Sequence, residues 1–493
     1  MCLWPIIKFW CGHFFYILNL CVFHKKSPLC YDFFAEITKH KGGFITVFNF
    51  ITNLLNIKPK DVKDFKIISL NGETQFHITL FPDEDSCPYC GGKIKGHGYA
   101  DPKRINHPIL TDKNSVIIFK RNRYLCTECL KTFSGKNPFT YSNFRNSYFV
   151  LDRVMKNLKN LNYTYLMIAE NNNISVTQVQ KYFDSFVNIP RITLPESLGI
   201  DEIHSKMAKR KNSVYLGVLV DNVNRSLLDI LPSRSKLELS RYFERIPLEE
   251  RKRVKYVTID MWVPYKDVSK KYLPNCIIAV DPFHVVEHLM DGFTRIRLNI
   301  LNQCEYNSDT YYLLKTWKDL IEKDVFLDNE PKYNKRFDKK LNKRDLQNMI
   351  LAINENLCLG FRLKEMYLQF NKEATEDNCE KWFDTIYQSL VASGIREYDE
   401  FITTLKNWKT EILNSFKRPF DDRKLSNALS ENINGQLRTY ISISKGISNF
   451  TRFRKRSIFA LNPKMYYSIT GKLSTDKREG KLRGSYQTNN NEL

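Results

Sequence analysis

The sequence predicts a multidomain protein that combines α+β and α/β structure, and three observations support this prediction. The chain has 493 residues, which exceeds the size of one ordinary domain. Hydrophobic residues make up 42% of it, enough to form buried cores, so a wholly disordered chain is excluded. The residue pattern also changes along the chain, from paired cysteines to short amphipathic helices, then to apolar strands followed by acids, and then to a long helical region.

The charge balance indicates a polyanionic partner. Lys and Arg number 76 against 54 Asp and Glu, so the formal net charge is +22. Such a surplus fits either nucleic acid or an anionic membrane face. Of the two, we expect nucleic acid, because phosphate contacts made by Lys and Arg dominate binding to it.

The first 47 residues form an atypical extension, which the sequence leaves open to three interpretations. Residues 1–23 are apolar and aromatic, as in a signal peptide or a membrane anchor. Lys8, His13 and Asn19 interrupt this stretch, and no cleavage pattern follows it. The alternatives are translated upstream sequence, with the working protein starting near residues 44–56, or an ordered segment. We expect no association with membranes.

Two CxxC pairs predict a zinc-binding domain over residues 48–140. A CxxC turn brings two thiolates to one ion, and a second turn completes a tetrahedral four-sulfur shell without an open position. The zinc would therefore be structural, held by Cys87, Cys90, Cys126 and Cys129. A redox role is less favoured, because two pairs are present and neither has a βαβ context. No disulfide framework is expected in so long a chain, which fits a reducing, cytosolic setting.

The next segment, residues 141–190, has the pattern of a helix-turn-helix. Apolar residues recur at helical spacing over residues 148–161, and a second short helix ends in an Asn-rich turn. Ser175 is placed to cap the following helix, which begins at Val176. A plain helical hairpin looks the same, but the neighbouring zinc module favours DNA binding. The side chains expected in the major groove are Thr177, Gln178, Gln180 and Lys181.

After residue 190, the pattern becomes that of a mixed sheet. Three apolar runs, at residues 198–204, 214–220 and 226–231, predict antiparallel strands. Helices are expected at residues 236–253 and 263–272, alternating with strands at 254–260 and 276–280. Three antiparallel strands followed by α/β alternation predict a ribonuclease-H-like sheet, whose first part covers residues 191–295.

Acidic residues follow two of these strands and predict a divalent-metal site. Asp201 and Asp260 come after buried runs on strands that neighbour each other in this topology. Carboxylates so placed suit Mg²⁺ or Mn²⁺ and two-metal phosphoryl chemistry. Taken singly, each is equally well a solvated strand end.

A third carboxylate is expected from a helix beyond a long insertion. Residues 296–420 are charged and helical in pattern without strand alternation, so we predict an all-helical insertion. The last part of the core, residues 421–462, then contains a helix in which Asn427, Glu431 and Asn434 share one face. Ser426 or Asn427 would cap it. Residues 463–493 are expected to form a basic flexible tail.

Four blocks of the sequence, GIDE, VTIDMWVPY, PNCIIAVDPFHVVEHL and LSNALSENINGQLR, resemble the signature blocks of DDE-type insertion-sequence transposases, most closely the ISL-three family. The resemblance runs from about residue 50 to residue 461. It implies a catalytic, magnesium-binding triad of Asp201, Asp260 and Glu431, with Asp281 and His284 in support. It also implies contacts to the DNA backbone from a later block, through Arg452, Arg454 and Arg456.

The resemblance implies a transposase that binds the terminal inverted repeats of an insertion sequence and catalyses Mg²⁺-dependent cleavage and strand transfer. Its partners would be double-stranded DNA, both the element ends and the target, bound by a homodimer or higher oligomer in the bacterial nucleoid. The main alternative is a non-catalytic zinc-finger and helix-turn-helix regulator derived from a transposase. A serine or tyrosine recombinase, a plain nuclease and a membrane-anchored protein are weaker alternatives, because no nucleophile signature is evident and the anchor rests on residues 1–23 alone.

Overall fold

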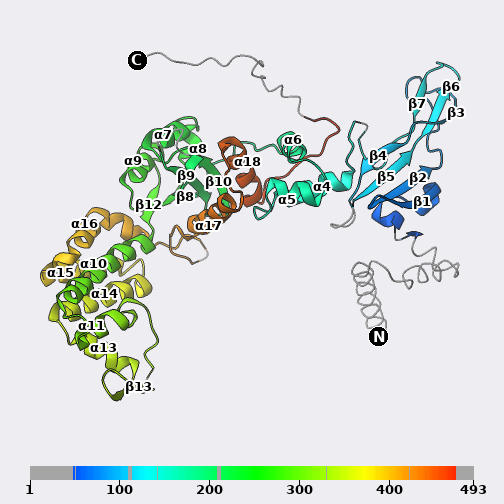
Figure 1. Cartoon of the computed structure of the whole chain (residues 1–493). Helices are drawn as coiled ribbons and strands as arrows, with labels where there is room; N and C mark the ends of the chain where they lie inside the picture. Colours follow the sequence, from blue (N-terminus) through cyan, green and yellow to red (C-terminus); the bar gives the residue numbers. More distant parts are fainter. Residues whose placement is uncertain are drawn as a thin grey trace, which may run out of the picture. The chain divides into compact units, whose positions relative to one another are not determined.

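The computed structural model describes residues 48–49, 51–108, 114–141, 143–207, 213–328, 330–420 and 422–473, which form two compact units (Figure 1). The first unit contains the paired cysteines, the following helices as far as Phe186, and residues 468–473. The second runs from Val187 to Tyr467 and also includes Leu158–Thr164. The expectations for residues 1–47 and for the end of the tail lie outside the described residues. Within the described part, no helix is both long and apolar enough to cross a membrane.

The first unit has two sheets. A four-stranded sheet has the order β1-β2-β5-β4, and its apolar side chains, among them Phe76, Ile117 and Phe119, form a core. A three-stranded sheet, β3-β6-β7, carries the cysteine pairs. The strands are β1 (Val62–Leu70), β2 (Glu73–Leu80), β3 (Ile94–Tyr99), β4 (Lys103–Asn106), β5 (Ser115–Lys120), β6 (Asn122–Cys126) and β7 (Thr132–Ser134), with a 3-10 turn η1 (Pro59–Asp61). Residues 115–126, which lead into the second cysteine pair, thus form two strands in different sheets, β5 and β6.

Three helices follow in the predicted order, α4 (Tyr148–Leu158), α5 (Tyr165–Asn171) and α6 (Val176–Phe186). The backbone N–H of Gln178 donates to Ser175 Oγ at 3.1 Å, the capping contact that the sequence predicted. Asn173 has a φ of 49°, so the Asn-rich turn between α5 and α6 uses the left-handed conformation that Asn tolerates. Helix α6 buries Val179, Tyr182 and Phe183 and leaves its opposite side toward solvent.

The second unit is built on a five-stranded sheet of order β10-β9-β8-β11-β12. Strands β10, β9 and β8 are antiparallel, and β8, β11 and β12 are parallel, as the sequence predicted. The elements are β8 (Ser197–His204), β9 (Tyr215–Asp221), β10 (Ser226–Leu231), α7 (Lys236–Glu244), α8 (Leu248–Arg251), β11 (Tyr256–Ile259), α9 (Val263–Tyr272) and β12 (Ile277–Val280). The single helix expected over residues 236–253 is two helices, because Pro247 lacks an N–H and stands at the start of α8.

The prediction of an all-helical insertion is wrong in one place. A short hairpin, β13 (Lys332–Asn334) and β14 (Lys339–Leu341), interrupts the helices, with Asp338 at a φ of 50° in its turn. The boundary expected at residue 296 also falls inside one continuous helix that begins directly after the sheet, α10 (Pro282–Gln303). The other elements are α11 (Asp309–Thr316), α12 (Asp319–Glu322), α13 (Lys343–Leu351), α14 (Glu355–Glu373), α15 (Cys379–Ser393), η3 (Arg396–Tyr398) and α16 (Asp399–Asn414).

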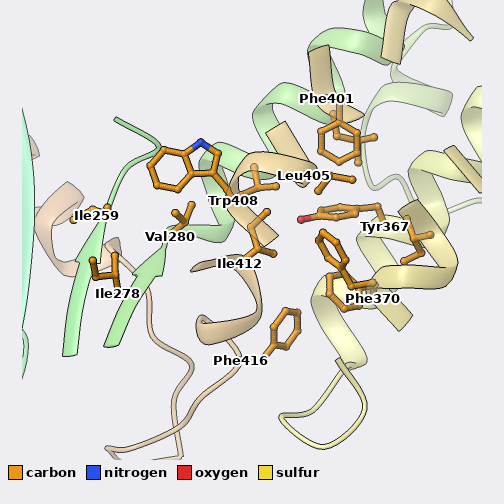
Figure 2. Close-up of a cluster of buried hydrophobic side chains, with 14 of the residues drawn as sticks. Ile259, Ile278, Val280, Tyr367, Phe370, Phe401, Leu405, Trp408, Ile412 and Phe416 are labelled. Atoms are coloured by element: carbon orange, nitrogen blue, oxygen red, sulfur yellow. The ribbon is translucent and has the colours of Figure 1, made fainter. Parts of the chain in front are cut away.

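The inserted helices share one hydrophobic core with the sheet (Figure 2). Helix α16 lies against the edge strand β12, where Trp408 and Ile412 face Ile278 and Val280. On its other side α16 packs on Tyr367 and Phe370 of α14. The insertion therefore supports the side of the sheet formed by β11 and β12, the strands that Asp260 and Asp281 directly follow.

Two further helices, α17 (Ala428–Ile443) and α18 (Phe450–Leu461), complete the second unit and pack against β8, β9 and β10. Gly199 of β8 makes the close approach of α17 possible, because a Cβ at this position would lie 2.6 Å from Ser430 Oγ. The helix that carries Glu431 is thus pressed directly against the strand that carries Asp201.

Candidate active site

Two aspartates stand at the same level on neighbouring parallel strands. Strands β8 and β11 are in register with Ile200 opposite Ile259, so the next residue on each is an aspartate. Asp201 and Asp260, together with Glu202, offer carboxylate oxygens that all lie within 4.8 Å of one another. Strand β8 ends at His204, where the strand predicted over residues 198–204 also ends, and Asp201 lies in its middle, opposite Val218 of β9. Asp201 is buried, so it is not a solvated strand end.

Glu431 reaches the same region from α17. It forms a second group with Asp281 and His284, whose ligand atoms also lie within 4.8 Å of one another. The two groups touch, because His284 Nε2 is 3.2 Å from Asp260 Oδ1. The structure thus gathers all five residues named from the sequence, Asp201, Asp260, Glu431, Asp281 and His284, into one cluster with Glu202.

Helix α17 also supplies two carboxamides that hold the aspartates. Asn434 Nδ2 donates to Asp201 Oδ2 at 2.8 Å, and Asn427 Nδ2 donates to Asp260 Oδ1 at 3.3 Å. Both asparagines are buried. Asn427 stands at the N-cap position, yet its side chain makes no capping bond, because it is turned toward Asp260. One face of α17 therefore presents Glu431, and its two asparagines orient Asp201 and Asp260.

Asp281 joins the two helices that border the site. Its Oδ1 accepts the backbone N–H of Phe283 at 3.1 Å and so caps α10, which carries His284. Its Oδ2 accepts the backbone N–H of Asn427 at 3.2 Å, at the start of α17. Because both oxygens are engaged and the side chain is buried, Asp281 fixes where His284 and Glu431 meet.

The electrostatics of the cluster fit a divalent cation. Burial, and then the neighbouring charge of Asp260, raise the pKa of Asp201 to about 7. Burial also raises the pKa of Asp281 and of Glu431. The hydrogen bond to Asp260 raises the pKa of His284 to about 9, so an imidazolium faces the acids. Mg²⁺ and Mn²⁺ prefer carboxylate oxygens as ligands. A cation bound here would also offset the repulsion among these buried, closely spaced carboxylates.

Glu202 is the site residue that sequence reasoning missed, although it follows Asp201 in the GIDE block. Its carboxylate accepts hydrogen bonds from Tyr265 and from Arg234. The Arg234 guanidinium in turn lies 4.2 Å from the ring centroid of Tyr215 and 4.6 Å from that of Trp262. Glu202 is thereby held by a tyrosine and an arginine, whereas the carboxamides of α17 hold Asp201 and Asp260. The position of Glu202 in the sequence alone does not reveal these partners.

The four cysteines of the first unit lie together as predicted. Sulfur separations are 3.7 Å from Cys87 to Cys129 and 3.5 Å from Cys90 to Cys126. A zinc tetrahedron with bonds of about 2.3 Å has edges of about 3.8 Å, so this cluster is consistent with Zn²⁺. The backbone N–H groups of Cys129 and Glu128 point at Cys126 Sγ and lower the pKa of this thiol to about 6, which favours the ligating thiolate.

The residues expected to contact DNA divide into two kinds. On α6, Thr177 and Lys181 are exposed and Gln178 and Gln180 are half-buried, so their side of the helix is open to a ligand. The three arginines of α18 differ from the expectation. Arg456 is fully buried and donates to the carbonyls of Leu158, Asn160 and Tyr163, so it stabilises a loop and cannot reach a phosphate.

The other two arginines of α18 also have protein contacts. Arg454 forms a two-pronged ion pair with Asp229, at 2.5 and 2.8 Å. Arg452 is half-buried. Two of the three arginines of this block therefore serve contacts inside the protein: Arg454 pairs with Asp229 of β10, and Arg456 binds carbonyls of the loop after α4. The charge pattern does not distinguish these roles from DNA contact.

Comparison with known proteins gives two matches. The family model described as transposase, DDE type of the ISL-three (ISL3) family, matches residues 198–457, more than half of the chain. The transposase for insertion sequence element IS1001 of Bordetella parapertussis is 25% identical over 279 residues, which are 56% of this chain and 59% of that protein. The aligned part thus spans less than two thirds of the relative's length. The matched range includes all six residues of the cluster, from Asp201 to Glu431. Because the family model matches more than half of the chain, the chain belongs to the ISL-three family of DDE transposases.

Proposed function

We propose that this chain is the transposase of an insertion sequence, which binds the element's terminal inverted repeats and catalyses Mg²⁺-dependent cleavage and transfer of DNA strands. The observation that carries the proposal is that two ligand groups adjoin: Asp201 with Asp260 on neighbouring strands, and Glu431 of α17 with Asp281 and His284. His284 Nε2, 3.2 Å from Asp260 Oδ1, links the two groups. Asp201, Asp260 and Glu431 are proposed as the catalytic, metal-binding triad. The strand order of the second unit supports a ribonuclease-H-like core.

The proposed domain organisation follows the sequence. Residues 48–140 would bind zinc and residues 141–190 would form the helix-turn-helix, with α6 as the recognition helix. The core would comprise residues 191–295 and 421–462, separated by the insertion at 296–420, with a basic tail after it. Exposed Thr177 and Lys181, with Gln178 and Gln180, would read the inverted repeat. A homodimer or higher oligomer would hold double-stranded element ends and target DNA.

The chain's own residues would prepare the chemistry by positioning. Asp201, Asp260 and Glu431 would hold Mg²⁺ or Mn²⁺, which would supply activation of an attacking oxygen and stabilisation of a leaving one. Asn434 and Asn427 hold Asp201 and Asp260 by donated hydrogen bonds, so the carboxylates are oriented before DNA arrives. Asp281 places the start of α17, and through it Glu431. No side chain is proposed to form a covalent bond to DNA, since phosphoryl transfer of this kind depends on position and charge.

A cleavage assay with separated readouts tests the proposal. The full chain would be incubated with Mg²⁺ and DNA bearing the element's terminal repeats, for Asp260→Asn and Glu431→Gln beside the unchanged protein. Cleavage should fall by more than the roughly 100-fold that loss of an outer partner costs at metal sites, while binding of the ends is retained. Asp291→Asn, an exposed aspartate of α10, is the matched control and should cleave normally.

The same assay decides between the proposal and a non-catalytic regulator. A regulator binds the repeats through the zinc and helix-turn-helix modules but shows no metal-dependent cleavage. Full activity in the Glu431→Gln protein would refute the triad. Absence of cleavage by the unchanged protein, with specific binding of the repeats, would favour the regulator.

A further inference from the structure

A groove runs along the outer side of α17, and none of the roles described above uses it. It consists of two hollows that meet at Asn432. The first, of about 380 Å³, lies over the start of α17, and the second, of about 630 Å³, lies between α17, the end of α18 and the loop at residues 159–162. All of its walls belong to the second unit.

The lining of the groove suits a nucleic acid strand. The first hollow is bordered by the cations Arg225, Arg423 and Lys424. The second is bordered by carboxamides and a hydroxyl, contributed by Asn160, Asn162, Asn432, Gln436 and Thr439. Among the described residues, no Asp or Glu lines either hollow. Cations and amides without competing carboxylates are the groups that contact phosphates and base edges.

Gly435 gives a second, independent indication. It lies in the interior of α17, where glycine is among the least favourable residues for a helix. Nothing within 4 Å would meet a Cβ at this position, so packing against the described residues does not require glycine there. Gly435 lines the groove, and a missing side chain lets a ligand approach the helix backbone closely.

The groove lies beside the acidic cluster and has one fixed wall. Consecutive helix residues point about 100° apart, so Asn432 opens next to the face on which Glu431 meets Asp281 and His284. The opposite wall, the loop at residues 159–162, is held by buried Arg456, which donates to the carbonyls of Leu158 and Asn160 at 3.4 and 3.2 Å.

We infer that this groove binds a strand of the DNA substrate, through its phosphodiester backbone and base edges, and leads it to the carboxylates. The inference rests on the proposed function. It assigns Asn432, Gly435 and Gln436 as DNA-contacting residues and gives Arg456 the role of a positioning residue for the groove wall.

The test uses the full-length protein without Mg²⁺ or Mn²⁺ and a fluorescein-labelled DNA duplex that carries a single-stranded 3′ extension. Gly435→Ala should keep or raise the melting temperature, because it removes a helix-breaking residue, yet weaken binding. Gly435→Gln should weaken binding by about tenfold, or about 1.4 kcal/mol, since it fills the groove. Thr403→Gln, on the exposed side of α16, is the control and should bind as the unchanged protein does.

Photo-cross-linking gives the second readout. A benzophenone side chain at position 436 should cross-link to the labelled strand, whereas one at position 403 should not. Binding by Gly435→Gln within about twofold of the unchanged protein, or cross-linking no stronger at 436 than at 403, would overturn the inference. Neither measurement requires cleavage of DNA. If the protein cross-links to DNA through the groove but does not cleave it, only the proposed function is refuted.

Discussion

The contact between Gly199 and α17 gives the most demanding prediction. A Cβ on residue 199 would lie 2.6 Å from Ser430 Oγ, and ordinary contact begins at 3.4 Å. Gly199→Ala therefore requires about 0.8 Å of separation (3.4 minus 2.6) at the point where α17 crosses β8. The added Cβ would also lie 3.2 Å from Oδ1 of Asn427, the residue whose amide nitrogen donates to Asp260.

The expected loss follows from this displacement. A misplacement of about 1 Å in an active site costs about 100-fold in rate, so we expect cleavage by Gly199→Ala to fall by about 10- to 100-fold. Overpacking of this kind lowers the free energy of unfolding by about 1–3 kcal/mol. Cleavage of repeat-containing DNA with Mg²⁺ and urea unfolding of the same preparations measure the two effects.

A second substitution isolates the cause. Ser430 Oγ is buried and has no hydrogen-bond partner among the described residues, so Ser430→Ala alone should cost little stability. Combined with Gly199→Ala, it removes the closest contact and should restore most of the activity. Gly96→Ala, where an added Cβ meets nothing within 4 Å, is the matched control. The reasoning is refuted if Gly199→Ala cleaves normally, or if the double variant is no better than the single one.

Three further outcomes are expected. Asn434→Leu removes the donor to Asp201 and should lower cleavage by about 10- to 100-fold with little change in DNA binding, measured by anisotropy on the same preparations; equal loss of binding would contradict a positioning role. Cys90→Ser should reduce zinc content and order in the three-stranded sheet, measured by metal analysis and hydrogen exchange, and unaltered zinc content would rule out the four-sulfur site. Burial, and then the charge of Arg153, lower the pKa of His107 to about 4. The imidazole ring of His107 hydrogen-bonds to Ser147 and is neutral in the folded protein. In the unfolded chain this histidine binds a proton near pH 6.5, so the free energy of unfolding of the first unit should fall by about 3 kcal/mol between pH 6.5 and pH 4. Acid unfolding of His107→Gln should show a smaller dependence of this free energy on pH.

Much of the candidate site was predictable from local patterns. The i, i+3 and i+4 spacing of Asn427, Glu431 and Asn434 places them on one helix face whatever the helix packs against. The CxxC spacing likewise brings Cys87 and Cys90 to one point before any fold is known. Strand order was predictable because apolar alternation and short connections leave few topologies.

The errors share a cause, which is that contacts distant in sequence override local appearance. Arg456 looks like its neighbours in a basic run, but the loop at Leu158–Thr164 surrounds it and supplies its acceptors. The hairpin at residues 332–341 has no strong strand alternation, and its turn depends on one residue, Asp338, in the left-handed conformation. Helix α10 passes through the expected domain boundary because its apolar face is buried in the core shared by sheet and insertion.

The sequence by itself determined which residues could carry chemistry, namely four thiols, three carboxylates and two carboxamides, because residue type and spacing fix donor sets and helix faces. Only the tertiary structure decided how these groups are used. Burial raises the pKa of Asp201, and the close approach at Gly199 brings the helix of Glu431 to the strands. Asn427, a helix-capping candidate by sequence, instead donates a hydrogen bond to Asp260, and Asn434 donates one to Asp201. Desolvation and hydrogen-bond partners depend on which segments meet, and those meetings join residues that are more than 160 positions apart in the chain.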